Sequence, residues 1–128
     1  AEAVLGAVGA TVWIEDEALM DAVTAISGSG PAYVFWFIEQ LANAGAALGL
    51  PVEISKKLAR ETVLGSARLA AQSADSPAVL RERVTSKGGT TEAALKAFDE
   101  QKLAERFVRA IEAARDRGAE LGVMLAKD

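Results

Sequence analysis

The chain has 128 residues, which suffice for one domain around one core. Hydrophobic residues make up 51% of it and argue against general disorder. The net charge of −4, from 18 acidic and 14 basic residues, argues against a nucleic-acid partner. Cysteine and histidine are both absent. Disulfides, thiol chemistry and Ser-His-Asp or Cys-His catalysis are therefore excluded, and no metal site is expected.

Alanine, the strongest helix former, is frequent throughout the chain, and clusters of β-branched and aromatic residues are sparse. The composition therefore predicts an all-α fold. No basic segment followed by a cleavage site opens the sequence, so no signal peptide is expected and the predicted location is cytoplasmic.

The N-terminal part of the chain predicts a helix and then a strand. Residues 1–10 suggest a short helix that ends at Gly9, and residues 11–14 (Thr-Val-Trp-Ile) are four β-favouring residues in a row. A single strand is not stable by itself. We therefore expect this strand to belong to a sheet further upstream, and the chain to be a fragment of a longer protein.

A helix is predicted after the three acidic residues at 15–17, which suit the positive end of the helix dipole. The apolar positions that follow at helical spacing are interrupted by Ser-Gly-Ser-Gly-Pro at 27–31. Glycines permit a bend, and proline is tolerated in the first turn of a helix. Two helices, or one kinked helix, are expected here.

Residues 32–48 are apolar on nearly every side, with only Glu39, Gln40 and Asn43 as polar members. A membrane-spanning helix is disfavoured because the segment is short and carries Glu39 near its middle. A helix of this kind needs apolar cover on several sides. Such cover is hard to provide within a chain of this length, so the pattern predicts that a second subunit covers one side.

The rest of the chain predicts four more helices, which cover residues 50–74, 78–84, 91–98 and 102–126. The pair Ser76-Pro77 is a clear start signal, because serine caps a helix and proline fits its first position. Together with the two helices before them, they predict a bundle of about six.

The last predicted helix carries a heptad seam, in which apolar or small residues alternate at steps of four and three. The seam consists of Phe107, Ile111, Ala114, Gly118, Leu121 and Leu125. It is either a stripe that faces the chain's own core or a contact with a second subunit, and both interpretations stay open.

Two glycine-containing segments could carry chemistry. The first, Gly28-Ser29-Gly30, does not match a dinucleotide-binding fingerprint, because Tyr33 stands where the third glycine belongs and a helix precedes it. A nucleophilic serine is excluded by the absence of histidine. A bend that lets backbones pack closely is the favoured interpretation.

The second segment is the loop Thr-Ser-Lys-Gly-Gly-Thr-Thr at residues 85–91. Its glycines can adopt conformations closed to other residues, and Thr90 is predicted to cap the next helix, with Glu92 in the first turn. Free backbone N–H groups at a helix start favour an anion, and the hydroxyls of Ser86, Thr90 and Thr91 add to them. The loop is either a cradle for a carboxylate or phosphate or a plain glycine-rich turn. It does not have the residue order of a Walker P-loop.

Residues 80–95 (Leu-Arg-Glu-Arg-Val-Thr-Ser-Lys-Gly-Gly-Thr-Thr-Glu-Ala-Ala-Leu) closely resemble the signature of pyrroline-5-carboxylate reductases. Residues 21–33 resemble the start of the C-terminal domain in the same family. Two motifs in the right order make the resemblance specific, and it covers essentially the whole chain. It implies that residues 15–128 form a helical dimerisation and substrate-loop domain, similar to the C-terminal domain of 6-phosphogluconate dehydrogenase. Residues 1–14 would then be the end of a Rossmann domain.

The resemblance also implies a function. Members of the family reduce 1-pyrroline-5-carboxylate to L-proline, the last step of proline biosynthesis, with NADPH or NADH that is bound mainly by the N-terminal domain. Their helical domains interlock into a homodimer, and some members form decamers. The isolated fragment is therefore expected to be inactive.

The same resemblance implies roles for single residues. It places the substrate carboxylate on backbone N–H groups of the loop, and the hydroxyl of Thr91 on the ring nitrogen. The substrate-binding residues are then Ser86, Gly88, Gly89, Thr90 and Thr91, and Thr91 is the catalytic one. The loop departs from the family at Lys87, where proline is often found.

Two other functions stay open. A non-enzymatic helical oligomerisation module would not need the hydroxyl of Thr91 for any turnover. The helical domain of another NAD(P)-dependent dehydrogenase would act on a different imino or hydroxy acid. Neither nucleic acid nor a membrane is expected as a partner.

Overall fold

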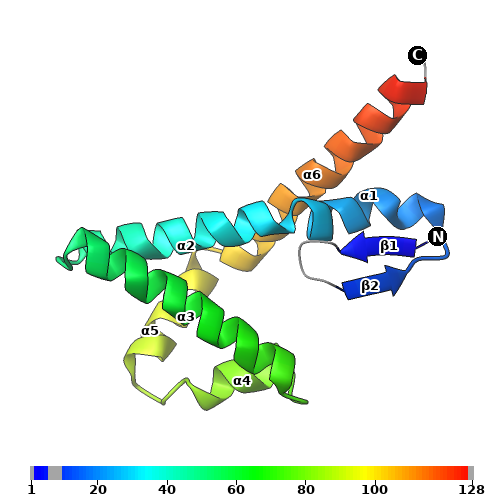
Figure 1. Cartoon of the computed structure of the whole chain (residues 1–128). Coiled ribbons are helices and arrows are strands. Elements are labelled where there is room, and N and C mark those ends of the chain that lie inside the picture. The colour runs from blue at the N-terminus through cyan, green and yellow to red at the C-terminus, as the bar shows by residue number, and fades with distance from the viewer. Residues whose placement is uncertain (1, 6–9, 127–128) are drawn as a thin grey trace. The chain divides into compact units, whose positions relative to one another are not determined.

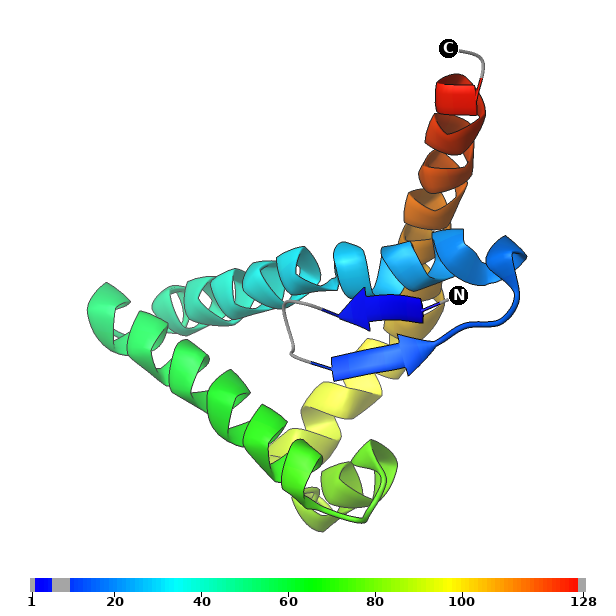
Figure 2. The ribbon, with the colours of Figure 1, turned by 45° about the vertical axis from the view of Figure 1, so that its right-hand side comes forward.

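The computed structural model describes residues 2–5 and 10–126. These residues fall into two compact units, one formed by the described residues up to Val34 and from Leu103 onward, the other by Phe35–Lys102. Figures 1 and 2 show that helices dominate both units, so the predicted all-α class is confirmed. The helical elements are η1 (Glu17–Leu19), α1 (Met20–Val23), η2 (Thr24–Gly28), α2 (Gly30–Ala47), α3 (Val52–Gln72), α4 (Pro77–Arg83), α5 (Thr90–Glu100) and α6 (Leu103–Ala126).

Within the described residues, five helices have seven or more residues, slightly fewer than the predicted six. The difference arises in the first unit, where α1 has only four residues and continues directly into η2. The four downstream helices begin and end within a few residues of their predicted bounds.

The N-terminal part forms a β-hairpin, in which β1 (Glu2–Leu5) pairs antiparallel with β2 (Ala10–Trp13). The strand predicted at residues 11–14 is confirmed, shifted by one residue. Two expectations are wrong: Glu2–Leu5 is a strand and not part of a helix, and β2 has a partner within the chain. A lone strand leaves the backbone N–H and C=O groups on both of its edges unpaired, and pairing with β1 satisfies those on one edge of β2. Residues 6–9, where the predicted helix was to end, lie outside the described residues.

The first helical segment starts where the acidic residues predict it. Asp16 is the N-cap of η1, and its Oδ1 accepts a hydrogen bond of 2.9 Å from the backbone N–H of Ala18. Glu17 lies in the first turn, where a negative charge is favourable for the helix dipole.

The predicted bend at residues 27–31 takes the form of a π-helical segment, η2, between α1 and α2. The N–H of Ser29 donates to the carbonyl of Thr24 over 2.9 Å, which skips the usual α-helical acceptor, the carbonyl of Ala25. The hydroxyl of Tyr33 donates to this carbonyl instead, also over 2.9 Å. The side chain of Tyr33, on α2, therefore provides a donor for the carbonyl that the π-helical pattern leaves without a backbone partner.

The core of the first unit lies where α6 packs against α1 and η2. Ala25 is only 1% exposed, and the ring of Tyr33 meets Phe107 edge to face at 6.4 Å between centroids. Gly118 allows the close approach, because a Cβ there would lie 3.1 Å from Oδ1 of Asp21. The middle of the predicted heptad seam thus faces the unit's own helices, whereas Leu125 near its end is 74% exposed.

The second unit is organised around the corner between α2 and α3. Gly49 has φ +102° and ends α2, while the N–H of Leu50 donates to the carbonyl of Gly45. Ser55 is only 2% exposed, and its hydroxyl donates to the carbonyl of Ala42 over 2.6 Å. Figure 1 shows the two helices meeting at this corner and diverging from it. This corner therefore holds one of the few buried side chains of the described residues.

The segment that follows α3 begins α4 as predicted. The hydroxyl of Ser76 accepts a hydrogen bond of 3.2 Å from the N–H of Val79, and Pro77 is in the first turn. An ion pair of 2.6 Å between Asp75 and Arg83 spans the helix from its entry to its end. Both ends of α4 are therefore fixed, and its C-terminal end leads into the loop at 85–89.

Candidate functional site

The loop between α4 and α5 is fixed to the end of α4 at its start. The backbone N–H of Thr85 donates to the carbonyl of Glu82 over 3.1 Å. The hydroxyl of Thr85 donates to the carbonyl of Arg81 over 2.6 Å, and this carbonyl also accepts a hydrogen bond of 3.2 Å from the N–H of Val84. The hydroxyl of Thr85 therefore already has a partner within the chain, and the donors without a partner lie after Thr85.

The two glycines of the loop have different reasons to be glycine. Gly88 has φ +75°, a backbone conformation that side chains strongly disfavour. Gly89 has an ordinary φ of −92°, but a Cβ there would lie 3.2 Å from the carbonyl oxygen of Ser86. The N–H of Gly89 also donates to this oxygen over 3.0 Å. The chain therefore reverses tightly over Ser86 before it enters α5.

The start of α5 differs from its prediction by one residue. Gly89 is the N-cap and Thr90 is the first helical residue, so the prediction that Thr90 caps the helix is wrong. The physical reason is that Gly89 is already extended while its carbonyl accepts the first helical bond, from the N–H of Ala93 at 3.2 Å. Instead of a cap from Thr90, the carboxylate of Glu92 accepts a hydrogen bond of 3.2 Å from the N–H of Gly88.

Several donors at this helix start have no partner. In the described structure, the backbone N–H groups of Thr90, Thr91 and Glu92 make no hydrogen bond. The hydroxyls of Ser86, Thr90 and Thr91 make none either. Thr91 is half-buried, whereas Ser86 and Thr90 are exposed. Such a set of convergent N–H and O–H groups at the positive end of an 11-residue helix is chemically suited to an anion.

The glycine-serine segment at 28–30 lies at the junction of η2 and α2 and is helical, not a strand-to-helix turn. The hydroxyl of Ser27 donates to the carbonyl of Val23, and the N–H of Ser29 continues the π-helix. These residues therefore build a bend, as predicted, and do not fit a dinucleotide. Within residues 2–5 and 10–126, no three carboxylates gather in a way that could hold a metal ion.

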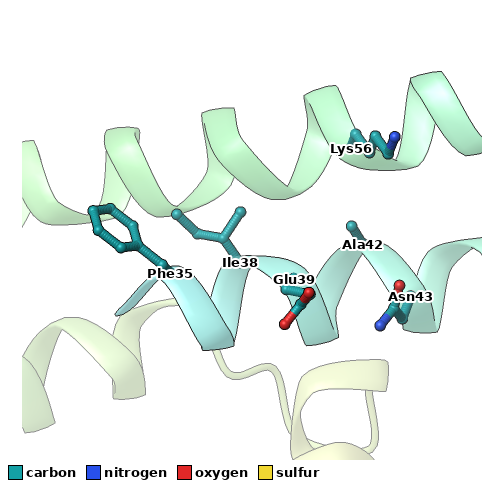
Figure 3. Close-up of a pocket in the computed structure, with 6 residues that line it drawn as sticks. All are labelled: Phe35, Ile38, Glu39, Ala42, Asn43 and Lys56. Carbon is teal, nitrogen blue, oxygen red and sulfur yellow. The ribbon is translucent and has the colours of Figure 1, made fainter. Parts of the chain in front are cut away.

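The structure adds a groove that the sequence analysis did not identify. It lies where α2 and α3 diverge, has a volume of about 380 Å³, and is lined by Phe35, Ile38, Glu39, Ala42, Asn43 and Lys56. Figure 3 shows Ile38 and Ala42 pointing toward α3, whereas Glu39 points away from it. The lining is mostly apolar and open, so the groove is not shaped to enclose a small polar ligand.

The apolar side chains of α2 are poorly covered by the chain itself. Phe35, Trp36 and Phe37 are 68%, 61% and 51% exposed. The only buried apolar residues in the described part of the chain are two alanines, Ala25 and Ala59. Large contiguous apolar surfaces of this kind mark a contact with another chain or with lipid. None of the described helices is long and apolar enough to span a bilayer.

Comparisons with known proteins identify the family. A family model described as pyrroline-5-carboxylate reductase dimerisation matches residues 17–121. The pyrroline-5-carboxylate reductases of Pseudomonas aeruginosa and Synechocystis are 47% and 46% identical to the chain, over 96% and 95% of its length. Each alignment covers 45% of the relative, so the chain spans less than half the length of these curated relatives.

Solved structures agree with this assignment. A pyrroline-5-carboxylate reductase from Coxiella burnetii superposes with a TM-score of 0.82 at 44% identity, over 86% of this chain and 41% of its own. The Plasmodium falciparum pyrroline carboxylate reductase, solved with NADP bound, gives 0.79 at 37% identity, over 84% of this chain and 41% of its own. The fold, the two motifs and the family model therefore converge: the chain belongs to the pyrroline-5-carboxylate reductase family and carries its dimerisation domain.

Proposed function

We propose that this chain is the dimerisation and substrate-loop domain of a reductase that converts 1-pyrroline-5-carboxylate to L-proline in proline biosynthesis. Family membership supports the reaction. The observation that carries the role of the loop is the start of α5, where free backbone N–H groups lie beside the free hydroxyl of Thr91. Residues 15–128 form this domain, and residues 1–14 are the end of a Rossmann domain. A cytoplasmic location stays a prediction.

The substrate is a cyclic imine with one carboxylate, and the two groups need different partners. The carboxylate accepts hydrogen bonds from the open N–H groups at the start of α5, with the hydroxyls of Ser86 and Thr90 beside them. The N–H groups of Gly88 and Gly89 already have acceptors, so these two residues contribute the shape of the turn. This assignment divides the predicted substrate-binding residues into donors and shape-determining glycines.

The hydroxyl of Thr91 orients the ring nitrogen. Hydride addition to the imine carbon turns this nitrogen into an amine, and a fixed hydroxyl can hydrogen-bond it in both states. Thr91 is half-buried on the first turn of α5, so its position is fixed by the helix. No histidine is needed, because a substrate that binds as the protonated imine brings its own proton.

The hydride comes from NADPH or NADH, and the residues of this chain do not fit that cofactor. The segment at 28–30 is helical and is followed by Tyr33 in place of a third glycine. We assign the cofactor mainly to the part of the Rossmann domain that lies outside these 128 residues. The 128-residue chain by itself should therefore not oxidise NADPH in the presence of pyrroline-5-carboxylate, and clear turnover by it would contradict this assignment.

The exposed aromatic residues of α2 support a homodimer as the working unit. Phe35, Trp36 and Phe37 are three consecutive aromatic residues that are each more than half exposed, and a second copy of the domain would cover them. Assembly of dimers into a decamer stays a prediction. Light scattering at micromolar concentration should give the mass of a dimer or of a multiple of it, and a monomer would contradict the proposal.

The central experiment is Thr91→Val in the full-length protein, which keeps the shape of the side chain and removes its hydroxyl. The loss of one positioned donor costs about 1–3 kcal/mol of transition-state stabilisation, or about 5- to 150-fold in kcat/KM. Thr62→Val on the exposed side of α3 is the matched control and should leave turnover unchanged.

The two alternatives make different predictions in the same assay. A non-enzymatic oligomerisation module predicts that Thr91→Val leaves turnover of the full-length protein intact. A reductase for another acid predicts that imino or hydroxy acids other than pyrroline-5-carboxylate have the higher kcat/KM. Turnover of pyrroline-5-carboxylate that is insensitive to Thr91→Val would refute the assigned role of Thr91 while leaving the reaction intact.

A further inference from the structure

Glu92 is absent from the substrate-binding residues assigned above, yet its side chain makes a direct contact with the loop. Its Oε1 accepts a hydrogen bond of 3.2 Å from the backbone N–H of Gly88. This hydrogen bond connects the glycine turn to the first turn of α5. It joins the residue with the disfavoured φ of +75° to the helix that carries Thr91.

The contact completes the bonding of the glycine turn. The N–H of Gly89 donates to the carbonyl of Ser86, and the N–H of Gly88 donates to Glu92, so one glycine donor has its acceptor in the loop and the other on α5. The open donors are then those of the first turn of α5. The side chain of Glu92 is exposed, and no other contact of this side chain fixes the turn. In the described structure, Glu92 is therefore the only residue of α5 whose side chain hydrogen-bonds to Gly88.

The same carboxylate carries a charge of the wrong sign for the proposed substrate. Within the described residues, Glu92 forms no ion pair at 4 Å or less, and Lys96 is the basic residue one helical turn further along α5. A substrate carboxylate on the first-turn N–H groups would lie within a few residues of it. Two carboxylates about 5 Å apart repel each other even in a water-like dielectric, by about 0.8 kcal/mol, which changes a binding constant about fourfold.

We infer that Glu92 is a positioning residue with two opposing effects: its oxygen holds the Gly88 turn in shape, and its charge lowers the affinity for the anionic substrate. The inference rests on the proposed function, because it assumes that the ligand of this loop is a carboxylate. A purely structural residue would have the first effect alone, so the two effects can be separated by substitution.

Three substitutions in the full-length protein separate shape from charge. Glu92→Gln keeps an acceptor oxygen at the same reach and removes the charge, so KM for pyrroline-5-carboxylate should fall about fourfold while kcat stays the same. Glu92→Ala removes both the oxygen and the charge, so the turn loosens and its KM should exceed that of Glu92→Gln. Glu92→Asp keeps the charge on a shorter side chain, so its KM should rise most. Glu100→Gln, an exposed residue at the other end of α5, is the control for net charge.

Salt provides a readout that a structural role would not change. Repulsion between exposed charges is screened over about 3 Å at 1 M ionic strength, against about 10 Å at 0.1 M. The ratio of the wild-type KM to the KM of Glu92→Gln should therefore fall toward one as the salt concentration is raised. A KM of Glu92→Gln that equals the wild-type value at low salt, or a ratio that does not change with salt, would overturn the charge effect.

The shape effect has a readout that does not need turnover. In the NMR spectrum of the full-length protein, the amide proton of Gly88 should move upfield in Glu92→Ala and stay near its wild-type position in Glu92→Gln. An unmoved proton in Glu92→Ala would overturn the positioning role. If the wild type reduces no pyrroline-5-carboxylate, the proposed function fails, and the Gly88 proton still decides whether Glu92 holds the turn.

Discussion

The close approach of α2 and α3 predicts that Gly45→Ala is strongly destabilising although alanine is the better helix former. A Cβ at position 45 would overlap the hydroxyl oxygen of Ser55 and lie 3.2 Å from its Cβ and 3.3 Å from Cδ1 of Leu50. Ser55 cannot move away freely, because it is 2% exposed and its hydroxyl donates to the carbonyl of Ala42.

The magnitude follows from three terms. Overpacking of a well-packed contact costs about 1–3 kcal/mol. Displacement of the Ser55 hydroxyl loses a hydrogen bond that contributes about 1 kcal/mol. Replacement of glycine by alanine within a helix returns about 1 kcal/mol. The net expectation is a loss of about 2 kcal/mol in the free energy of unfolding.

Urea unfolding, followed by circular dichroism at one fixed protein concentration, measures this loss. Gly65→Ala on α3 is the matched control: nothing lies within 4 Å of a Cβ there, so this variant should be about 0.5–1 kcal/mol more stable. Adding Ser55→Ala to Gly45→Ala should recover part of the loss, since it removes the overlapped oxygen. A Gly45→Ala protein as stable as the wild type, or a double variant whose losses simply add, would refute the reasoning.

Two further substitutions test the bend and the loop. Tyr33→Phe removes the hydroxyl that donates to the carbonyl of Ala25, and it should lower the free energy of unfolding by about 1 kcal/mol in thermal denaturation. An unchanged midpoint would mean that water satisfies this carbonyl equally well. Gly88→Ala forces a side chain into a φ of +75°, at a cost of about 1 kcal/mol, and should raise KM for pyrroline-5-carboxylate in the full-length protein. Gly30→Ala is its control, because position 30 has open space for a Cβ and no positive φ. Equal KM values in the two variants would contradict the requirement for glycine at position 88.

The sequence predicted the elements whose signals are local. The kink before Pro31, the cap at Ser76 and the helices after residue 50 were all found near their expected positions. Each depends on residues a few positions apart, such as a capping side chain and the N–H three residues on. The loop at 85–91 was located by the same kind of signal, and it lies within the residues that the family model matches.

The features that the sequence did not predict depend on partners that are further apart or on exact backbone geometry. The strand at Glu2–Leu5 forms because β2 is available to pair with it, and its own residues also suit a helix. The contact of Gly45 with Ser55 joins two helices, and it produces no periodic pattern in the sequence. The N-cap at Gly89 and the contact between Gly88 and Glu92 follow from the tight reversal over Ser86, which a sequence motif does not specify.

The corner at Ser55 also sets an order of events in assembly. Ser55 and Ala42 are 13 residues apart, and a loop of about this length closes in roughly 10–100 ns. Two subunits at micromolar concentration meet productively about once per second, if they associate at about 10⁶ M⁻¹s⁻¹. The α2–α3 hairpin therefore has many opportunities to form before a partner arrives. Each subunit can present Phe35, Trp36 and Phe37 on a preformed helix. Association then brings two folded surfaces together and does not require this helix to fold on binding.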